Sequence, residues 1–105
     1  MFEELIDPLT IYSGKKNYKI PTINEEEVSV KYGKEILNKI IELKKIFFES
    51  SAYKFYEAKT NFDLNLIDKK VKEDFLSKYP KCCDEVLNIL TWMYTYAVWK
   101  DGVIS

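Results

Sequence analysis

The part of the sequence that most constrains the fold is the C-terminal segment, residues 84–100, which reads DEVLNILTWMYTYAVWK. On a helix of 3.6 residues per turn, its apolar side chains form two adjacent stripes instead of one. The first stripe contains Cys83, Val86, Leu87, Leu90, Tyr94 and Ala97, and the second contains Ile89, Trp92, Met93, Tyr96 and Trp99. A narrow polar seam remains through Asp84, Asn88, Thr91 and Thr95. We therefore expect this helix to be covered from several sides, by the rest of the chain, a second copy or a partner.

The length of the chain, 105 residues of which 47% are hydrophobic, predicts a single domain over residues 1–105. Its aromatic content is high, with eight Tyr, six Phe and two Trp. Tyr and Trp suit protein interfaces because the body of each side chain is apolar and its tip is polar. AT-rich coding raises Tyr, Phe, Ile, Lys and Asn together, however, and accounts for much of this content.

The charged residues argue against several classes of function. Sixteen basic residues, all of them Lys, face seventeen acidic ones, and the chain has no Arg and no His. Without Arg it lacks the bidentate group that reads guanine or clamps phosphate, so we expect no nucleic-acid binding. Without His it lacks the usual general base and the commonest metal ligand. We therefore expect no enzymatic activity, no metal and no cofactor.

The two cysteines, Cys82 and Cys83, are neighbours in the sequence. Adjacent cysteines rarely form a disulfide without strain, and two thiolates are too few for a structural zinc site. We interpret them as small apolar groups at a helix start, with Cys83 facing the core. The alternative, a redox or metal role, predicts a thiol of low pKa that reacts quickly with a mild alkylating agent.

No signal peptide or membrane span is expected. The N-terminus carries Glu3 and Glu4, which is the wrong charge for a signal peptide. The apolar part of residues 84–100 is about 14 residues long, shorter than the roughly 20 needed to cross a bilayer. We therefore expect a cytoplasmic protein with no membrane contact.

The N-terminal region reads as a β-hairpin over residues 9–20. Leu9 to Tyr12 are strand-like, a polar turn holds Gly14, and an extended pattern resumes before Pro21. The pair Asp7-Pro8 disfavours a helix at Asp7.

Helical patterns dominate the rest of the chain. Asn24 followed by three Glu predicts a capped helix start, although the alternation in residues 27–32 leaves strand and helix both open. We predict one or two helices over residues 34–59, a helix over 66–79 and a central apolar helix over 84–100, with Gly102 as its C-terminal cap. The predicted fold is α+β and mostly α-helical, with an N-terminal β-hairpin followed by three main helices.

The hairpin region also carries a resemblance. It reads Asp7-Pro8-Leu9-Thr10-Ile11, then Gly14-Lys15, then Tyr18-Lys19-Ile20-Pro21-Thr22-Ile23. This resembles the opening of the tail assembly chaperones of long-tailed phages and prophages of low-GC Gram-positive bacteria, and it covers about a quarter of the chain. The resemblance implies a protein without catalytic residues in the cytoplasm of a bacterial host cell. It also implies a homo-oligomer that coats the tape-measure protein and keeps it soluble during tail assembly.

The candidate partner-binding residues are the large aromatic side chains of the C-terminal segment, Trp92, Tyr94, Tyr96 and Trp99. Trp99 is the one most expected to be exposed, because it lies near the helix end. The simpler interpretation is that most of these side chains form the core. A rival function is that of a small stoichiometric inhibitor, such as an anti-defence or toxin-immunity protein, which would also act by protein–protein binding.

Overall fold

The fold was obtained as a computed structural model, which describes residues 1–17, 19–50 and 64–104, with side chains described for 1–17, 19–49 and 68–97. The described residues form a short 3₁₀ helix and five α-helices and contain no strand. In chain order these are η1 (Glu3–Leu5), α1 (Ile6–Ser13), α2 (Glu25–Tyr32), α3 (Lys34–Ser50), α5 (Leu64–Lys78) and α6 (Asp84–Ile104). The predicted α+β class and the β-hairpin over residues 9–20 are therefore wrong. The predicted helical continuation over 51–59 lies outside the described residues.

Helix α1 replaces the first strand of the predicted hairpin. Pro8 lies in the first helical turn, where its missing N–H costs nothing because the amides there have no intrahelical acceptor. Leu5, Leu9 and Tyr12 follow a helical spacing, and each is at most 2% exposed. Burying these three side chains in the core outweighs the strand propensity of Leu9 to Tyr12.

Gly14 ends α1 as a C-terminal cap, not as a hairpin turn. Its φ of 70° is left-handed, and its N–H donates to the carbonyls of Thr10 and Ile11 at 3.0 and 3.2 Å. The chain then returns, and the N–H groups of Thr22 and Asn24 donate to the carbonyls of Ser13 and Tyr12, both at 2.9 Å. The end of α1 is thus satisfied by the segment that follows it.

Helix α2 settles the choice between strand and helix for residues 27–32 in favour of helix. Asn24 is its N-cap residue by position, with Glu25, Glu26 and Glu27 in the first turn, but its side chain does not cap the helix. The Asn24 amide instead donates to the carbonyl of Ile11 at 2.9 Å and to the Thr22 hydroxyl at 2.8 Å. Its hydrogen bonds therefore tie the start of α2 to the end of α1.

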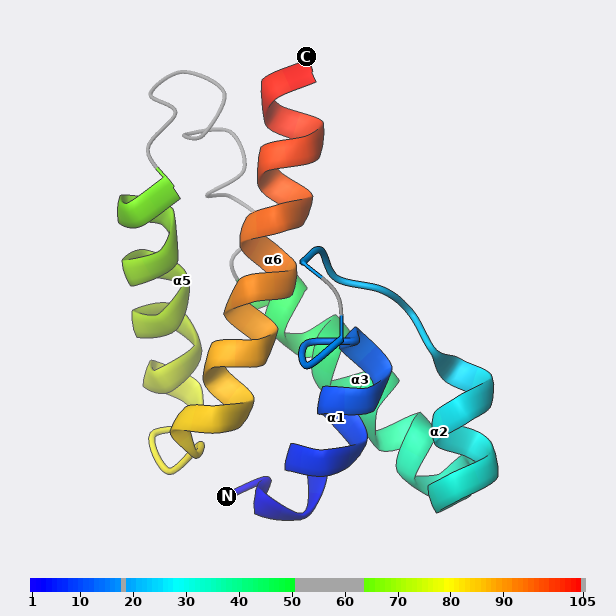
Figure 1. Cartoon of the computed structure of the whole chain (residues 1–105). Coiled ribbons are helices and arrows are strands. Elements are labelled where there is room, and N and C mark those ends of the chain that lie inside the picture. Colours follow the sequence, from blue (N-terminus) through cyan, green and yellow to red (C-terminus); the bar gives the residue numbers. More distant parts are fainter. Residues whose placement is uncertain (18, 51–63, 105) are drawn as a thin grey trace.

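Helix α6 lies at the centre of the fold (Figure 1). It runs antiparallel beside α5, with α1 along its N-terminal half and α3 behind it, while α2 lies further out against α3. The core residues that are at most 5% exposed on α6 are Val86, Leu87, Ile89, Leu90, Thr91, Met93 and Tyr94. Both apolar stripes of this helix therefore contribute to the core.

The polar seam expected along α6 is only partly present. Asp84 and Asn88 are exposed, whereas Thr91 is 1% exposed and its hydroxyl donates to the carbonyl of Leu87 at 2.6 Å. A threonine can be buried in a helix when its hydroxyl bonds back to the preceding turn in this way. Gly102 was also misread, because α6 continues past it to Ile104 and so does not use it as a cap.

Replacing Leu90, which is fully buried on α6, by Ala tests the central place of this helix. We expect Leu90→Ala to lower the free energy of unfolding by about 2–5 kcal/mol, since it leaves a cavity in the core. Asn88→Ala, an exposed change two residues away on the same helix, should change it by less than about 0.5 kcal/mol. Urea unfolding followed by circular dichroism measures both; equal stabilities for the two variants would contradict this core.

Candidate functional site

The described surface has several hollows large enough to receive part of another molecule. The first, which we call the N-terminal groove, has a volume of about 600 Å³. It is lined by Met1, Phe2, Glu4, Leu5, Asn38, Lys39, Glu42, Leu43, Ile46 and Tyr79. Its walls thus come from the start of the chain, from α3 and from the residue that follows α5. The lining is mainly apolar, with charged and polar side chains from Glu4, Asn38, Lys39 and Glu42.

The start of the chain is held firmly against the turn between α5 and α6. The Met1 ammonium donates to the carbonyl of Lys81 at 2.8 Å, and the N–H of Cys83 donates to the carbonyl of Met1 at 3.1 Å. The ammonium also lies 2.5 Å from a Glu3 carboxylate oxygen, and this contact raises its pKa and lowers the pKa of Glu3. The wall of the N-terminal groove is therefore preformed.

Phe2 forms this wall with an unusual backbone. Its φ is 72°, a left-handed conformation that bulky residues rarely adopt. The Phe2 ring lies edge-on to the Tyr79 ring with centroids 5.8 Å apart, and its carbonyl accepts from the N–H of Leu5 at 2.9 Å. The strained backbone persists because neighbouring contacts fix it from both sides.

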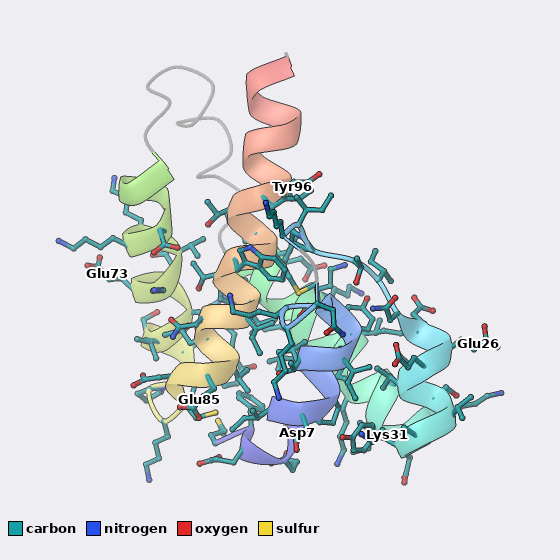
Figure 2. The ribbon with its side chains drawn as sticks, in the orientation of Figure 1. Asp7, Glu26, Lys31, Glu73, Glu85 and Tyr96 are labelled. Carbon is teal, nitrogen blue, oxygen red and sulfur yellow. The ribbon has the colours of Figure 1, made fainter. Side chains whose placement is uncertain are left out.

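The second groove, which we call the Tyr96 groove, has a volume of about 310 Å³. It is lined by Pro21, Thr22, Ile23, Lys44, Phe48, Met93, Tyr96 and Ala97. Three parts of the chain meet here: the segment between α1 and α2, the C-terminal part of α3, and α6. Figure 2 shows Tyr96 on the side of α6 that faces the segment leading to α2. Apart from Lys44 and Thr22, most of this lining is apolar or aromatic.

Among the described side chains, Lys44 is the one cation that lines the Tyr96 groove. Its Nζ lies 5.6 Å from the ring centroids of both Tyr12 and Phe48, within the range of cation–π attraction. Burial lowers the pKa of Lys44, while the negative charge of Glu25 acts in the opposite direction. Among the described residues Lys44 forms no ion pair. A half-buried ammonium without an anion is a natural place for a carboxylate from another molecule.

The two grooves lie on opposite sides of α3. Asn38, Glu42 and Ile46 recur every four residues and face the N-terminal groove. Lys44 and Phe48, also four residues apart, face the Tyr96 groove, about half a turn of the helix away from the first set. One groove can therefore be occupied without blocking the other.

A third hollow adjoins the Tyr96 groove at the start of α2. It is lined by Ile23, Asn24, Glu25, Glu26, Glu27, Val30 and Lys31, and it shares Ile23 with the Tyr96 groove. Ile23 is 61% exposed and Val30 is 82% exposed. Figure 2 shows Glu26 on the outer side of α2, pointing away from the helix bundle. Exposed apolar side chains therefore extend from the Tyr96 groove onto α2, among acidic residues.

The four candidate partner-binding residues are in four different situations. Tyr94 is 4% exposed and packs in the core, with its ring 5.2 Å from that of Phe48. Trp92 is half-buried, and Lys15 Nζ lies 4.5 Å from the centre of its ring. Tyr96 is half-buried and lines the groove named after it. The Trp99 side chain lies outside the described residues. Their role in partner binding stays a prediction.

Sequence reasoning missed Lys44, Phe48 and Ile23 as groove residues. A signal for Lys44 was present, because it lies four residues after Ile40 and four before Phe48, on the apolar side of α3. A lysine that follows this spacing among apolar residues is either paired with an anion or placed at the edge of a hydrophobic surface. Ile23 and Pro21 carried no comparable signal, since their positions depend on how the segment folds back onto α1.

The cysteines are free thiols at the turn before α6, Cys82 buried and Cys83 half-buried. Burial raises the pKa of the Cys82 thiol to about 11. Such a thiol is the opposite of the low-pKa nucleophile that a redox role predicts. The described residues contain no group of three or more His, Cys, Asp or Glu that could hold a metal ion.

Three comparisons with known proteins found no match for this chain. No family model matches the chain, and no curated protein and no solved structure is significantly similar to it. In the part of the chain that the structure describes, no helix is both long and apolar enough to span a membrane.

The raised pKa of Cys82 predicts how stability depends on pH. The pKa of the Cys82 thiol is about 11 in the folded state, whereas the ordinary pKa of a thiol is 9.0. The native state therefore binds more protons between these values, so the free energy of unfolding should fall as pH rises from 9 toward 11. Urea unfolding at several pH values measures this fall, and Cys82→Ala should reduce it. An unchanged slope in Cys82→Ala would show that the Cys82 thiol is not the source.

Proposed function

We propose that the protein acts without catalysis, by holding an amphipathic helix of a partner protein in the N-terminal groove. The observation that carries this proposal is the groove itself, an apolar floor with charged and polar side chains around it. A docked amphipathic helix would bury its apolar face on Phe2, Leu43 and Ile46 and keep its polar flanks beside Glu4, Lys39 and Glu42.

The dimensions of the N-terminal groove fit this mode of binding. Its α3 wall runs from Asn38 to Ile46, nine residues that span about 12 Å along the helix axis. That length accommodates about two turns of a partner helix, with apolar anchors at the i, i+3, i+4 and i+7 spacing. Because the Met1 and Phe2 wall is already tied to the α5–α6 turn, little ordering of the groove would oppose binding.

The partner we propose is a long helical tape-measure protein, for which this protein would serve as a tail assembly chaperone. The sequence resemblance suggested this role, but the described residues that carry it form α1, its Gly14 cap and the returning segment, and not strands. The resemblance therefore contributes the role and no longer the fold. A chaperone of this kind needs many shallow apolar contacts along a rod, and the open N-terminal groove provides one per copy.

The DNA beside the gene tests the identity of the partner. We expect a slippery run near the stop codon with an overlapping shifted frame, followed by a very long reading frame that encodes a helical protein. Co-expression with that protein should keep it in the soluble fraction, and it should precipitate when expressed alone. A gene without such a neighbour would exclude the tape-measure role.

A paired substitution on α3 tests the groove. Ile46 lines the N-terminal groove, whereas Ile41 is exposed on the same helix and does not line it. We expect Ile46→Ser to weaken binding of the long helical protein by roughly tenfold or more, as loss of a central apolar anchor does, and Ile41→Ser to leave it unchanged. Pull-down from co-expressing cells measures binding, and thermal melts confirm that both variants fold. Equal binding by the two variants would contradict the groove assignment.

The rival function, stoichiometric inhibition of an enzyme or toxin, also depends on protein–protein binding but predicts a different oligomeric state for the free protein. An inhibitor is a monomer until its target is added, whereas a chaperone of the proposed type associates with itself at rising concentration. Sedimentation of the purified protein therefore separates the two proposals before any partner is known.

A further inference from the structure

The Tyr96 groove carries an unpaired cation and, on the adjoining hollow, an unpaired anion. Lys44 forms no ion pair within the described structure, and Glu25, exposed at the first position of α2, forms none either. The two charges are close enough for Glu25 to act on the pKa of Lys44. Apolar side chains surround them, with Ile23 61% exposed between the two hollows and Val30 82% exposed on α2.

A surface of this kind is complementary to itself. A contact with two-fold symmetry brings the same patch of both copies together. If one residue of the first copy meets another residue of the second copy, the second residue of the first copy also meets the first residue of the second copy. A patch with one cation, a nearby anion and apolar side chains around them can then pair both charges twice while burying the apolar side chains. No other molecule is needed to satisfy it.

We propose that the Tyr96 groove is a two-fold contact between two copies of this chain, with Lys44 of each copy paired to Glu25 of the other. Ile23, Phe48 and Tyr96 form its apolar part, and Val30 extends it along α2. The proposed function requires self-association, and this contact gives its surface and its symmetry. Only the biological purpose of the dimer rests on the proposed function.

A second copy of the chain accounts for this surface better than a phosphate group or a single carboxylate does. A phosphate group would meet the negative charges of Glu25, Glu26 and Glu27, which outnumber the two lysines that line these hollows, Lys31 and Lys44. The chain also has no Arg to hold a phosphate. A single carboxylate placed on Lys44 would leave Glu25 and the exposed Val30 without partners. The two-fold contact pairs Lys44 with Glu25 and covers Val30 at the same time.

Charge reversal on each side of the pair tests the proposal. Lys44→Glu places two acids opposite each other, and Glu25→Lys places two cations opposite each other, while the double variant restores opposite charges. Each dimer contains the pair twice, so a loss of roughly tenfold per pair weakens dimerisation roughly 100-fold in either single variant. The double variant should recover most of this loss. Glu85→Lys, a reversal at the exposed start of α6, is the matched control and should dimerise as the unchanged protein does (Figure 2).

Sedimentation velocity of the purified protein, without any partner, is the measurement, over about 1 µM to 1 mM. A dimer in the unchanged protein that both single variants disrupt and the double variant restores supports the proposal. A monomer throughout this range overturns it, and so does a dimer that neither single variant weakens.

If reversal at the half-buried Lys44 unfolds the chain, Lys44→Met and the surface change Ile23→Ser take its place, and dimers of unchanged strength in both overturn the proposal. Partner binding through the N-terminal groove is measured separately with Ile46→Ser, so each proposal can fail while the other stands.

Discussion

Helix α6 is apolar around most of its circumference, and the need to cover it determines where the other helices lie. Helix α5 runs beside it, α3 lies behind it, and α1 covers part of a third side (Figure 1). Helix α1 has eight residues, or about 12 Å, against twenty-one residues, or about 32 Å, in α6. It therefore cannot cover its side of α6 completely. Beyond Gly14 the cover comes from the non-helical segment that holds Pro21, Thr22 and Ile23, and the Tyr96 groove opens where this thinner cover meets α6.

The position of that segment depends on a few hydrogen bonds. Thr22 and Asn24 donate their backbone N–H groups to carbonyls at the end of α1, and the Asn24 side chain adds a third bond to Ile11. These bonds satisfy carbonyls that a helix end would otherwise leave without donors. The segment that satisfies the end of α1 therefore also leads into α2 and, through Pro21, Thr22 and Ile23, forms one wall of the Tyr96 groove.

Sequence reasoning located the long helices because each carries many apolar residues in a clear period. It failed at the N-terminus for a physical reason. Leu9 to Tyr12 have strand propensity, and four residues are too few to distinguish the helical period of 3.6 residues from the strand period of two. The deciding residue, Leu5, lay outside the stretch that was interpreted as a hairpin. Pro8 was taken as a barrier to helix formation, although a proline in the first turn is tolerated. Short segments of this kind take the structure that buries their apolar residues, and what they bury against is not visible locally.

The candidate surface was predicted by residue type, whereas the structure sorts those residues by their angle around α6. Trp92 and Tyr96 are four residues apart and lie on one side, while Tyr94 lies on the opposite side and belongs to the core. Aromatic content alone could not make this distinction. The sequence analysis did not consider Lys44, although its place between Ile40 and Phe48 sets it on the buried side of α3.

The opposite placement of the two grooves on α3 has a consequence for assembly. A two-fold contact closes on itself, so self-association through the Tyr96 groove would stop at the dimer and would not continue into a filament. Each dimer would then present two N-terminal grooves on surfaces that the contact leaves free. Because these grooves lie on the side of α3 opposite the contact, they would face outward in opposite directions, and each would be free to engage a separate helical segment.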